Sequence, residues 1–264
     1  YKVASITPVV VDAETTSLIL GITIMYDSSS TTYTADQIAS LVSTTVSNYS
    51  DTSLGTFNSP FRHSRLLGLI DNTDTSILNS IATVTLSKLF TPTLSTATDY
   101  RINFNNKFYN PVSGYNSVDG GIIASTGFYL GSVTTTTYFF DDDGSGNLRI
   151  YSLVAGVRTY TNNTAGTIDY INGLITINQI TMTGVAEVDG TTSTQIRITA
   201  IPNSYDITPV RNQILEIDLV NTNVTASVDA ISSTGVGFST TTTSAGTTTT
   251  TVSSVSSNPS SSAY

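Results

Sequence analysis

The sequence has no cysteine and little charge, and these two features exclude several kinds of functional site and of binding partner. With no cysteine among 264 residues, disulfides, thiolate metal sites and cysteine nucleophiles are excluded. Asp, Glu, Lys and Arg make up only 11% of the residues, and the formal net charge is -9. Because proteins bind nucleic acid through Lys and Arg contacts to phosphates, we expect no nucleic-acid partner. Stability has to come from packing or from assembly.

Long apolar segments and phosphate-binding loops are also missing. The run SLILGITIMY at residues 17–26 is among the longest apolar runs, and it is about half of the ~20 residues that a membrane helix needs. We therefore expect no transmembrane span. GSGN at residues 144–147 follows a predicted strand but opens no helix and carries no Lys, so we expect no nucleotide cofactor. The chain begins at Tyr1 without a signal-like segment, and we interpret it as a fragment of a longer protein.

Apolar periodicity predicts a strand, two helices and a strand in the first part of the chain. Residues 17–26 alternate as in a buried strand. Residues 34–49 begin with a T-x-x-Q capping box and continue with apolar residues at three- and four-residue steps, which predicts a helix. The Ser-Pro pair at 59–60 predicts the start of a second helix. Alternation returns over residues 77–90.

Beyond residue 95 the period becomes 2, and turn residues separate nine candidate strands. TIDYINGLITI, with Asn172-Gly173 between two alternating runs, predicts a β-hairpin. The fold class predicted is α+β, with an N-terminal α/β sandwich-like domain over residues 1–95 and a larger β-rich domain over 96–230. Residues 231–264 are predicted to form an extended, low-complexity Ser/Thr-rich tail. Such a tail cannot bury enough apolar surface alone, so we expect it to lie against another subunit.

Three consecutive aspartates stand out in TYFFDDDGSGNLRIY, residues 137–151. Asp141 and Asp143 have the spacing of the first ligands of a calcium loop, but Ser152 stands where the bidentate Glu belongs. We therefore interpret the run as a hairpin turn between two strands, with glycines supplying positive φ. Weak cation binding at Asp141 and Asp143 stays open as the alternative.

No arrangement of residues predicts catalysis. The single histidine, His63, lies on the second predicted helix, and nothing around Ser64 resembles a nucleophile elbow. Glu187 and Asp189 lie two apart on a predicted strand, which places them on one face without fixing the distance between their carboxyl groups. We expect no enzymatic activity and no catalytic residue.

The composition instead favours permanent assembly. The chain has fourteen tyrosines, a residue type that is enriched at interfaces. It also has few Lys to protect the edges of its many strands, whereas soluble monomers commonly protect such edges with charge.

Five segments, taken in order over about residues 3–220, resemble one family. They are VASITPVVVDAETTSLILGITIMYD, TADQIASLVSTTVSNY, LGTFNSPFRHSRLLGLIDNTDTSILNSIATVTLSKLFTPTL, DDDGSGNLRIY and ITAIPNSYDITPVRNQILEIDL. The resemblance is to the C-terminal half of the large baseplate wedge subunit of contractile-tailed bacteriophages, in its T-even and cyanophage branch. The broader group is the baseplate J-like family.

The resemblance implies a structural protein of the virion that is assembled in the bacterial host cytoplasm. Family members form intertwined homodimers, contact other wedge and hub proteins, build a ring around the hub, and rearrange when the sheath contracts. The best-matching positions are expected to hold the domain and its contacts, and no catalytic residue comes with the family. These positions are Phe61, Arg62, Arg65, Asp71, Asp74, Ser76, Pro209, Arg211, Asn212 and Asp218.

Two other classes remain as alternatives. A secreted or surface adhesin built of β-domains would suit the acidic, Thr-rich composition, but such arrays usually lack the predicted helix pair at 34–70. A tail-associated polysaccharide hydrolase would need two carboxylates about 5 to 9 Å apart in a groove.

Overall fold

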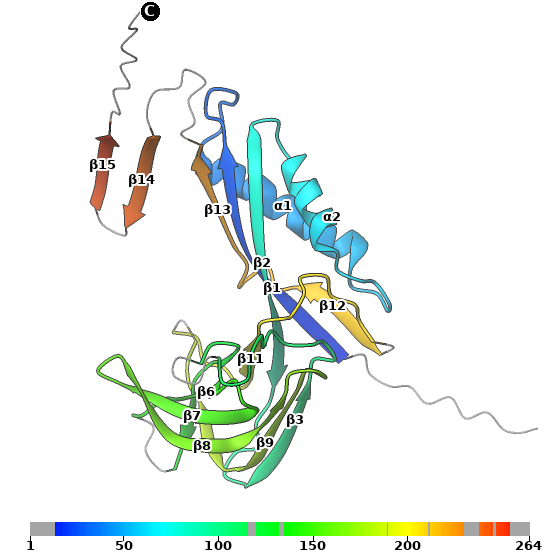
Figure 1. The fold of residues 1–264 in the computed structure, drawn as a ribbon, viewed down its shortest axis with the longest axis vertical. Helices are drawn as coiled ribbons and strands as arrows, with labels where there is room; N and C mark the ends of the chain where they lie inside the picture. Colours follow the sequence, from blue (N-terminus) through cyan, green and yellow to red (C-terminus); the bar gives the residue numbers. More distant parts are fainter. Residues whose placement is uncertain are drawn as a thin grey trace, which may run out of the picture.

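The computed structural model describes residues 14–115, 120–131, 135–188, 190–210, 212–229, 238–244 and 247–253. Within these residues, thirteen strands form one mixed sheet, two further strands form a separate hairpin, and two helices cover part of the large sheet (Figure 1). The elements are β1 (Glu14–Tyr26), α1 (Ala35–Ser53), α2 (His63–Asp71), β2 (Ile77–Phe90), β3 (Thr98–Asn103), β4 (Ile123–Ser125), β5 (Phe128–Leu130), β6 (Tyr138–Asp142), β7 (Asn147–Val154), β8 (Val157–Asp169), β9 (Leu174–Ile180), β10 (Met182–Val185), β11 (Ile196–Ala200), β12 (Gln213–Ile217), β13 (Asn223–Val228), β14 (Phe238–Ser244) and β15 (Thr247–Ser253).

The α+β fold class predicted from the sequence is wrong. The described chain is mostly β, and its hydrogen-bonded ladder is continuous from the helix-covered strands to the β-rich region. Strand β2 causes this continuity, because it pairs with β1 along residues 77–87 and with β11 along 86–90. Periodicity identifies a strand but not its partners, so the sequence did not reveal that β2 pairs with strands of both regions. The domain boundaries at residues 95 and 230 stay a prediction.

The helix-covered region combines the beginning and the end of the large sheet. β1 runs antiparallel to β2, and on its other side it pairs in parallel first with β12 and then with β13. The buried face of β1 consists of even-numbered residues, Leu18, Leu20, Ile22, Ile24 and Tyr26. The predicted alternation of this strand is confirmed, and β13 is a strand that the sequence analysis missed.

Both helices lie on this buried face. The capping box of α1 is confirmed, because the Thr34 side chain accepts from the Gln37 N–H and the Gln37 side chain accepts from the Thr34 N–H. Helix α1 buries residues at three- to four-residue spacing, namely Ile38, Val42, Val46 and Tyr49. Helix α2 begins at His63 rather than at Pro60, since Phe61 forms a β-bridge with Ile207 before the helix starts.

The β-rich region is built of hairpins. β6, β7, β8, β9 and β3 follow one another as antiparallel neighbours. The predicted Asn172-Gly173 turn joins β8 to β9, and Gly173 has φ of 67°. At this glycine a Cβ would lie 2.0 Å from the Asn106 carbonyl oxygen, so the position requires glycine for space as well as for φ.

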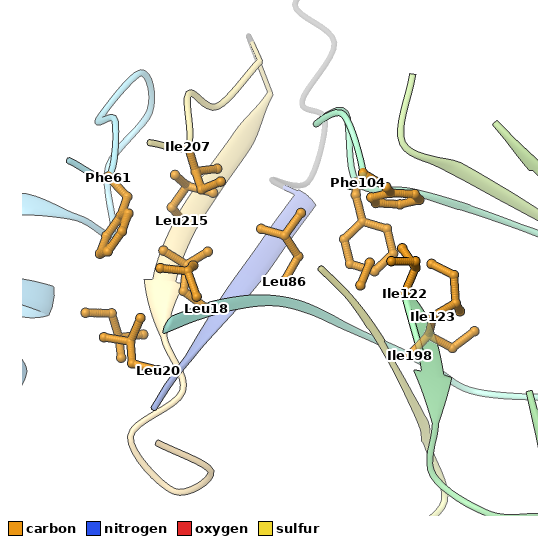
Figure 2. Close-up of a cluster of buried hydrophobic side chains, with 14 of the residues drawn as sticks. Leu18, Leu20, Phe61, Leu86, Phe104, Ile122, Ile123, Ile198, Ile207 and Leu215 are labelled. Carbon is orange, nitrogen blue, oxygen red and sulfur yellow. The ribbon is translucent and has the colours of Figure 1, made fainter. Parts of the chain in front are cut away.

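One hydrophobic cluster runs through both regions. Figure 2 shows Leu18, Leu20, Phe61, Ile207 and Leu215 on one side and Phe104, Ile122, Ile123 and Ile198 on the other, with Leu86 of β2 between them. All of these side chains are at most 3% exposed. The strand that links the two parts of the sheet therefore also links their cores.

The described part of the tail forms a hairpin in which β14 pairs antiparallel with β15. No helix in the described part of the chain is long and apolar enough to cross a membrane.

Candidate functional site

The aspartate run lies at the end of β6 and in the turn that follows it. Asp141 and Asp142 are the last residues of β6 and are 1% and 0% exposed, and only Asp143 belongs to the turn. β6 and β7 pair antiparallel with Asp141 opposite Arg149, so the predicted hairpin is confirmed. The sequence analysis missed the burial of Asp141. The hairpin register could have indicated this burial, because it places Arg149 directly across from Asp141.

Asp141 is the centre of a polar group that we call the aspartate cluster: Asp141, Arg149, Tyr151, Arg158 and Tyr160. Asp141 and Arg149 are buried, the two tyrosines are half-buried and Arg158 is exposed. Its carboxylate accepts from Arg149 Nε at 3.0 Å, Arg149 Nη2 at 3.3 Å, Arg158 Nη1 at 3.0 Å and Tyr160 OH at 2.8 Å. The two guanidinium groups also lie over tyrosine rings, Arg149 at 4.2 Å from the Tyr160 centroid and Arg158 at 4.8 Å from that of Tyr151. The cluster ties β6, β7 and β8 together.

Burial sets the protonation behaviour of this cluster. Loss of water raises the pKa of Asp141, while the Tyr160 hydroxyl and the two arginines act in the opposite direction. Burial also raises the pKa of Tyr151 and that of Tyr160, and the Asp141 carboxylate adds to both effects. Both phenols therefore stay protonated at neutral pH, and Tyr160 serves as a hydrogen-bond donor.

Asp142 points to the opposite face of β6, as alternation along a strand requires. Its carboxylate accepts from the backbone N–H groups of Ile122 and Ile123 at 3.0 and 2.9 Å and from Tyr170 OH at 2.9 Å. Burial and this carboxylate raise the pKa of Tyr170. Asp142 thus connects β6 to β4 and to the end of β8.

Asp143 makes the turn itself. One of its oxygens accepts from the N–H groups of Ser145 and Asn147, and the other accepts from the Asn147 side-chain amide. Partial burial opposes ionisation, but these hydrogen bonds prevail and lower the pKa of Asp143. Gly144 and Gly146 have φ of 72° and 105°, which the turn requires.

The geometry does not favour a cation at the two candidate ligands. A metal ion at Asp141 would have to compete with two guanidinium groups for the same carboxylate, and Asp143 already uses both oxygens within its own turn. Within the described ranges, no group of three or more His, Cys, Asp or Glu residues could hold a metal ion.

His63 has a packing position rather than a catalytic arrangement. Its Nε2 lies 2.8 Å from the Ala82 carbonyl oxygen of β2, and its ring lies 5.1 Å from the ring of Tyr205. Its own N–H donates to Asp206, which also pairs with Arg62 at 3.2 Å. His63 therefore joins α2 to β2 and to the loop before β12.

The positions implied by the family resemblance lie around the helix-covered region, and most have partners within the chain. Phe61 and Pro209 are buried, and Phe61 exchanges backbone hydrogen bonds with Ile207 at 2.9 and 3.0 Å. The structure thus brings the segment around residue 61 next to the segment around residue 209. Arg65 lies 5.9 Å from the centroid of the Tyr49 ring.

The acidic positions of this set also form internal contacts. Asp71 accepts from the Ser80 hydroxyl, and Asp74 accepts from the N–H and hydroxyl of Ser76 at the turn before β2. Asp218 pairs with Arg197 at 3.4 Å and caps the turn at Asn221.

Among the remaining positions, the Asn212 carbonyl accepts from the Glu14 N–H at 2.9 Å. Arg211 lies outside the described residues. That these positions contact other subunits stays a prediction.

Two of the hollows on the described surface are lined by acidic or aromatic side chains. Glu187 lines one of about 610 Å³, whose described lining contains no second carboxylate, and Asp189 lies outside the described residues. The other, of about 670 Å³, is lined by three tyrosines that the sequence analysis did not single out, Tyr109, Tyr115 and Tyr205. Tyr205 lies far from Tyr109 and Tyr115 in the sequence, so no local pattern could have indicated that the three residues line one hollow.

Comparison with models of protein families finds a match to part of the chain. The model of the family described as "Baseplate structural protein gp6, C-terminal domain III" matches residues 18–89. The matched stretch runs from β1 through α1 and α2 to β2, and it covers less than half of the chain. No curated protein matches the chain. The match supports a structural role in a phage tail baseplate.

Proposed function

We propose that the chain is part of a wedge subunit in the baseplate of a contractile-tailed phage. The observation that carries the proposal is the match of β1, α1, α2 and β2 to a baseplate structural domain. In this proposal the chain contacts a second copy of itself and other wedge and hub proteins, and these contacts build a ring around the hub. The chain does no chemistry, and its site of action is the virion.

The internal contacts of the helix-covered region fit such a role. Three of the positions expected from the resemblance hold the chain's own segments together, through the pairs Phe61–Ile207, Arg62–Asp206 and Asp218–Arg197. A subunit that transmits force needs a region that does not deform, and the internal contacts make the helix-covered region rigid in this way. When such a region stays rigid, the rearrangement is confined to the interfaces between subunits, which switch between discrete packings. We propose that sheath contraction repacks contacts between subunits and leaves this region intact.

Immunogold electron microscopy tests the proposal. Antibodies raised against the recombinant chain are expected to label the distal end of the tail on phage particles that encode it. The same antibodies absorbed with the recombinant chain serve as the control and should give no label. Label on the capsid, or along the whole tail, would contradict a baseplate position.

A further inference from the structure

Among the described strands, β13 has a neighbour on one side only, which is β1. The Asp229 N–H donates to the Tyr26 carbonyl oxygen at 2.8 Å, and Tyr26 is opposite Val228 in the parallel ladder between β1 and β13. Since alternate residues of a strand direct their backbone groups to opposite sides, odd-numbered residues of β13 bond to β1. The N–H and C=O groups of Val224, Ala226 and Val228 therefore point away from the sheet.

No other strand in the described part of the chain pairs with β13 on this side, and no hydrogen bond there reaches these outward groups. The strand reads NVTASV, without a charged residue or a proline. Natural proteins use charge and proline to keep a free edge from pairing with another chain. Val228 is 46% exposed, so the end of this edge is accessible. The edge is ready to accept a further strand.

The β14–β15 hairpin consists of two strands only and would be stabilised by pairing with a further strand. Its strands pair with each other from Phe238 opposite Ser253 to Ser244 opposite Thr247, and they form a sheet of their own apart from β13 (Figure 1). A lone two-stranded hairpin is marginally stable in water. The strand sequences, FSTTTTS and TTTTTVS, have no charge and are rich in Thr, which favours strands. Such a hairpin gains stability by joining a larger sheet.

We propose that the β14–β15 hairpin of one copy adds to the β13 edge of a second copy, so that exchanged tails link the subunits. Donor and acceptor belong to the same chain and are separated only by residues 229–237, yet they are not paired with each other. Neither strand carries charge, so two copies meet there without local repulsion although the chain as a whole has a net charge of -9. Strand exchange between identical chains is a low-cost route to a closed pair.

The inference rests on the proposed structural role, for which it supplies one copy-to-copy contact. Light scattering tests it with the full chain and with a chain that ends at Asp229. The full chain is expected to have a mass near twice 27.9 kDa, and the shortened chain is expected to be a monomer. A monomeric full chain would overturn the exchange.

A mixing experiment separates exchange from pairing within one chain. When the full chain is mixed with excess shortened chain, its hairpin is expected to occupy the empty β13 edge of the shortened partner, which gives a mixed dimer. Absence of the mixed species would overturn the exchange, since pairing within each chain leaves the two forms separate.

An edge variant tests the acceptor strand directly. Ala226→Pro removes an N–H that points outward and leaves the bonds between β13 and β1, so the dimer is expected to be lost while the circular dichroism spectrum of the folded chain is kept. Ala226→Ser keeps the N–H and should dimerise like the original chain. Should Ala226→Pro misfold, Ser227→Lys places a charge beside the same edge from an exposed position and is expected to weaken the dimer.

The outcomes distinguish this inference from the proposed function. A dimer that survives both the shortening and the edge variants would overturn tail exchange, while gold label at the tail tip would still support the baseplate role. Loss of the dimer in both cases, with no label on the tail, would support the exchange and contradict the baseplate role.

Discussion

At the scale of single residues, Asp141 is a buried carboxylate with two arginine partners. It neutralises two arginines in a site where the Arg149 side chain is only 7% exposed. A buried ion pair contributes little compared with an apolar pair, but removing one partner leaves an uncompensated charge. The aspartate cluster is therefore best understood as a specific connection between β6, β7 and β8.

Asp141→Asn is expected to lower the free energy of unfolding by about 3–5 kcal/mol, because Arg149 then lacks its buried counter-charge. Asp51→Asn, at an exposed position on α1, is the matched control and should change stability by less than about 0.5 kcal/mol. Urea unfolding measures both. Equal effects of the two substitutions would contradict the role assigned to Asp141.

Because of Asp143, the aspartate of the β6–β7 turn, we expect the free energy of unfolding to depend on pH. The pKa of Asp143 in the folded protein lies below the ordinary value of 3.8, so the contribution of this residue to stability is full above that value and is lost as the pH falls through the folded pKa. Asp143→Ala is expected to destabilise the chain at about pH 7, and the difference should shrink towards about pH 2. Ser145→Ala in the same turn removes no charge, and its effect on urea unfolding should not follow this pH dependence. A loss for Asp143→Ala that is independent of pH would be inconsistent with these contacts.

At the scale of elements, the sequence predicts strands and helices well where periodicity is strong. The helix expected over residues 34–49 is α1, and the strand expected over 77–90 is β2. The sequence misses β13, because NVTASV is short and its alternation is weak, and it divides β8 into two. Partner choice is a non-local property, so the pairing of β12 and β13 with β1 was beyond the reach of local patterns.

The capping box of α1 gives a prediction at this scale. Thr34→Ala removes the acceptor for the Gln37 N–H and is expected to lower the free energy of unfolding by about 1 kcal/mol. Thr32→Ala, at an exposed position ahead of the helix, is the control and should have little effect. Circular dichroism during thermal unfolding measures both, and a neutral Thr34→Ala would contradict the observed cap.

For two glycines, replacement by alanine is expected to change the stability of the chain in opposite directions. Gly68→Ala in α2 has open space around the added Cβ and is expected to stabilise the protein by about 0.5–1 kcal/mol. Gly173→Ala places a Cβ 2.0 Å from the Asn106 carbonyl oxygen at positive φ and is expected to destabilise it. Urea unfolding of the two variants should shift in opposite directions. A shift in the same direction would contradict the local geometry of one of them.

At the scale of the whole molecule, the sequence indicated the class of protein better than its fold. The expectation of a baseplate protein rested on long matching segments, and the family match over residues 18–89 supports a structural role of that kind. The α+β expectation failed because strand β2 continues from the helix-covered region into the β-rich region. Within the described residues, continuity through this single long strand joins the two regions in one thirteen-stranded sheet with one hydrophobic cluster.

Cryo-electron microscopy of the phage tail tests the central claim most directly. The account predicts that density at the distal end of the tail fits β1, α1, α2 and β2 with β12 and β13 alongside β1, in several symmetry-related copies around the hub. Density for this fold elsewhere in the virion, or a complete baseplate map without it, would contradict the account.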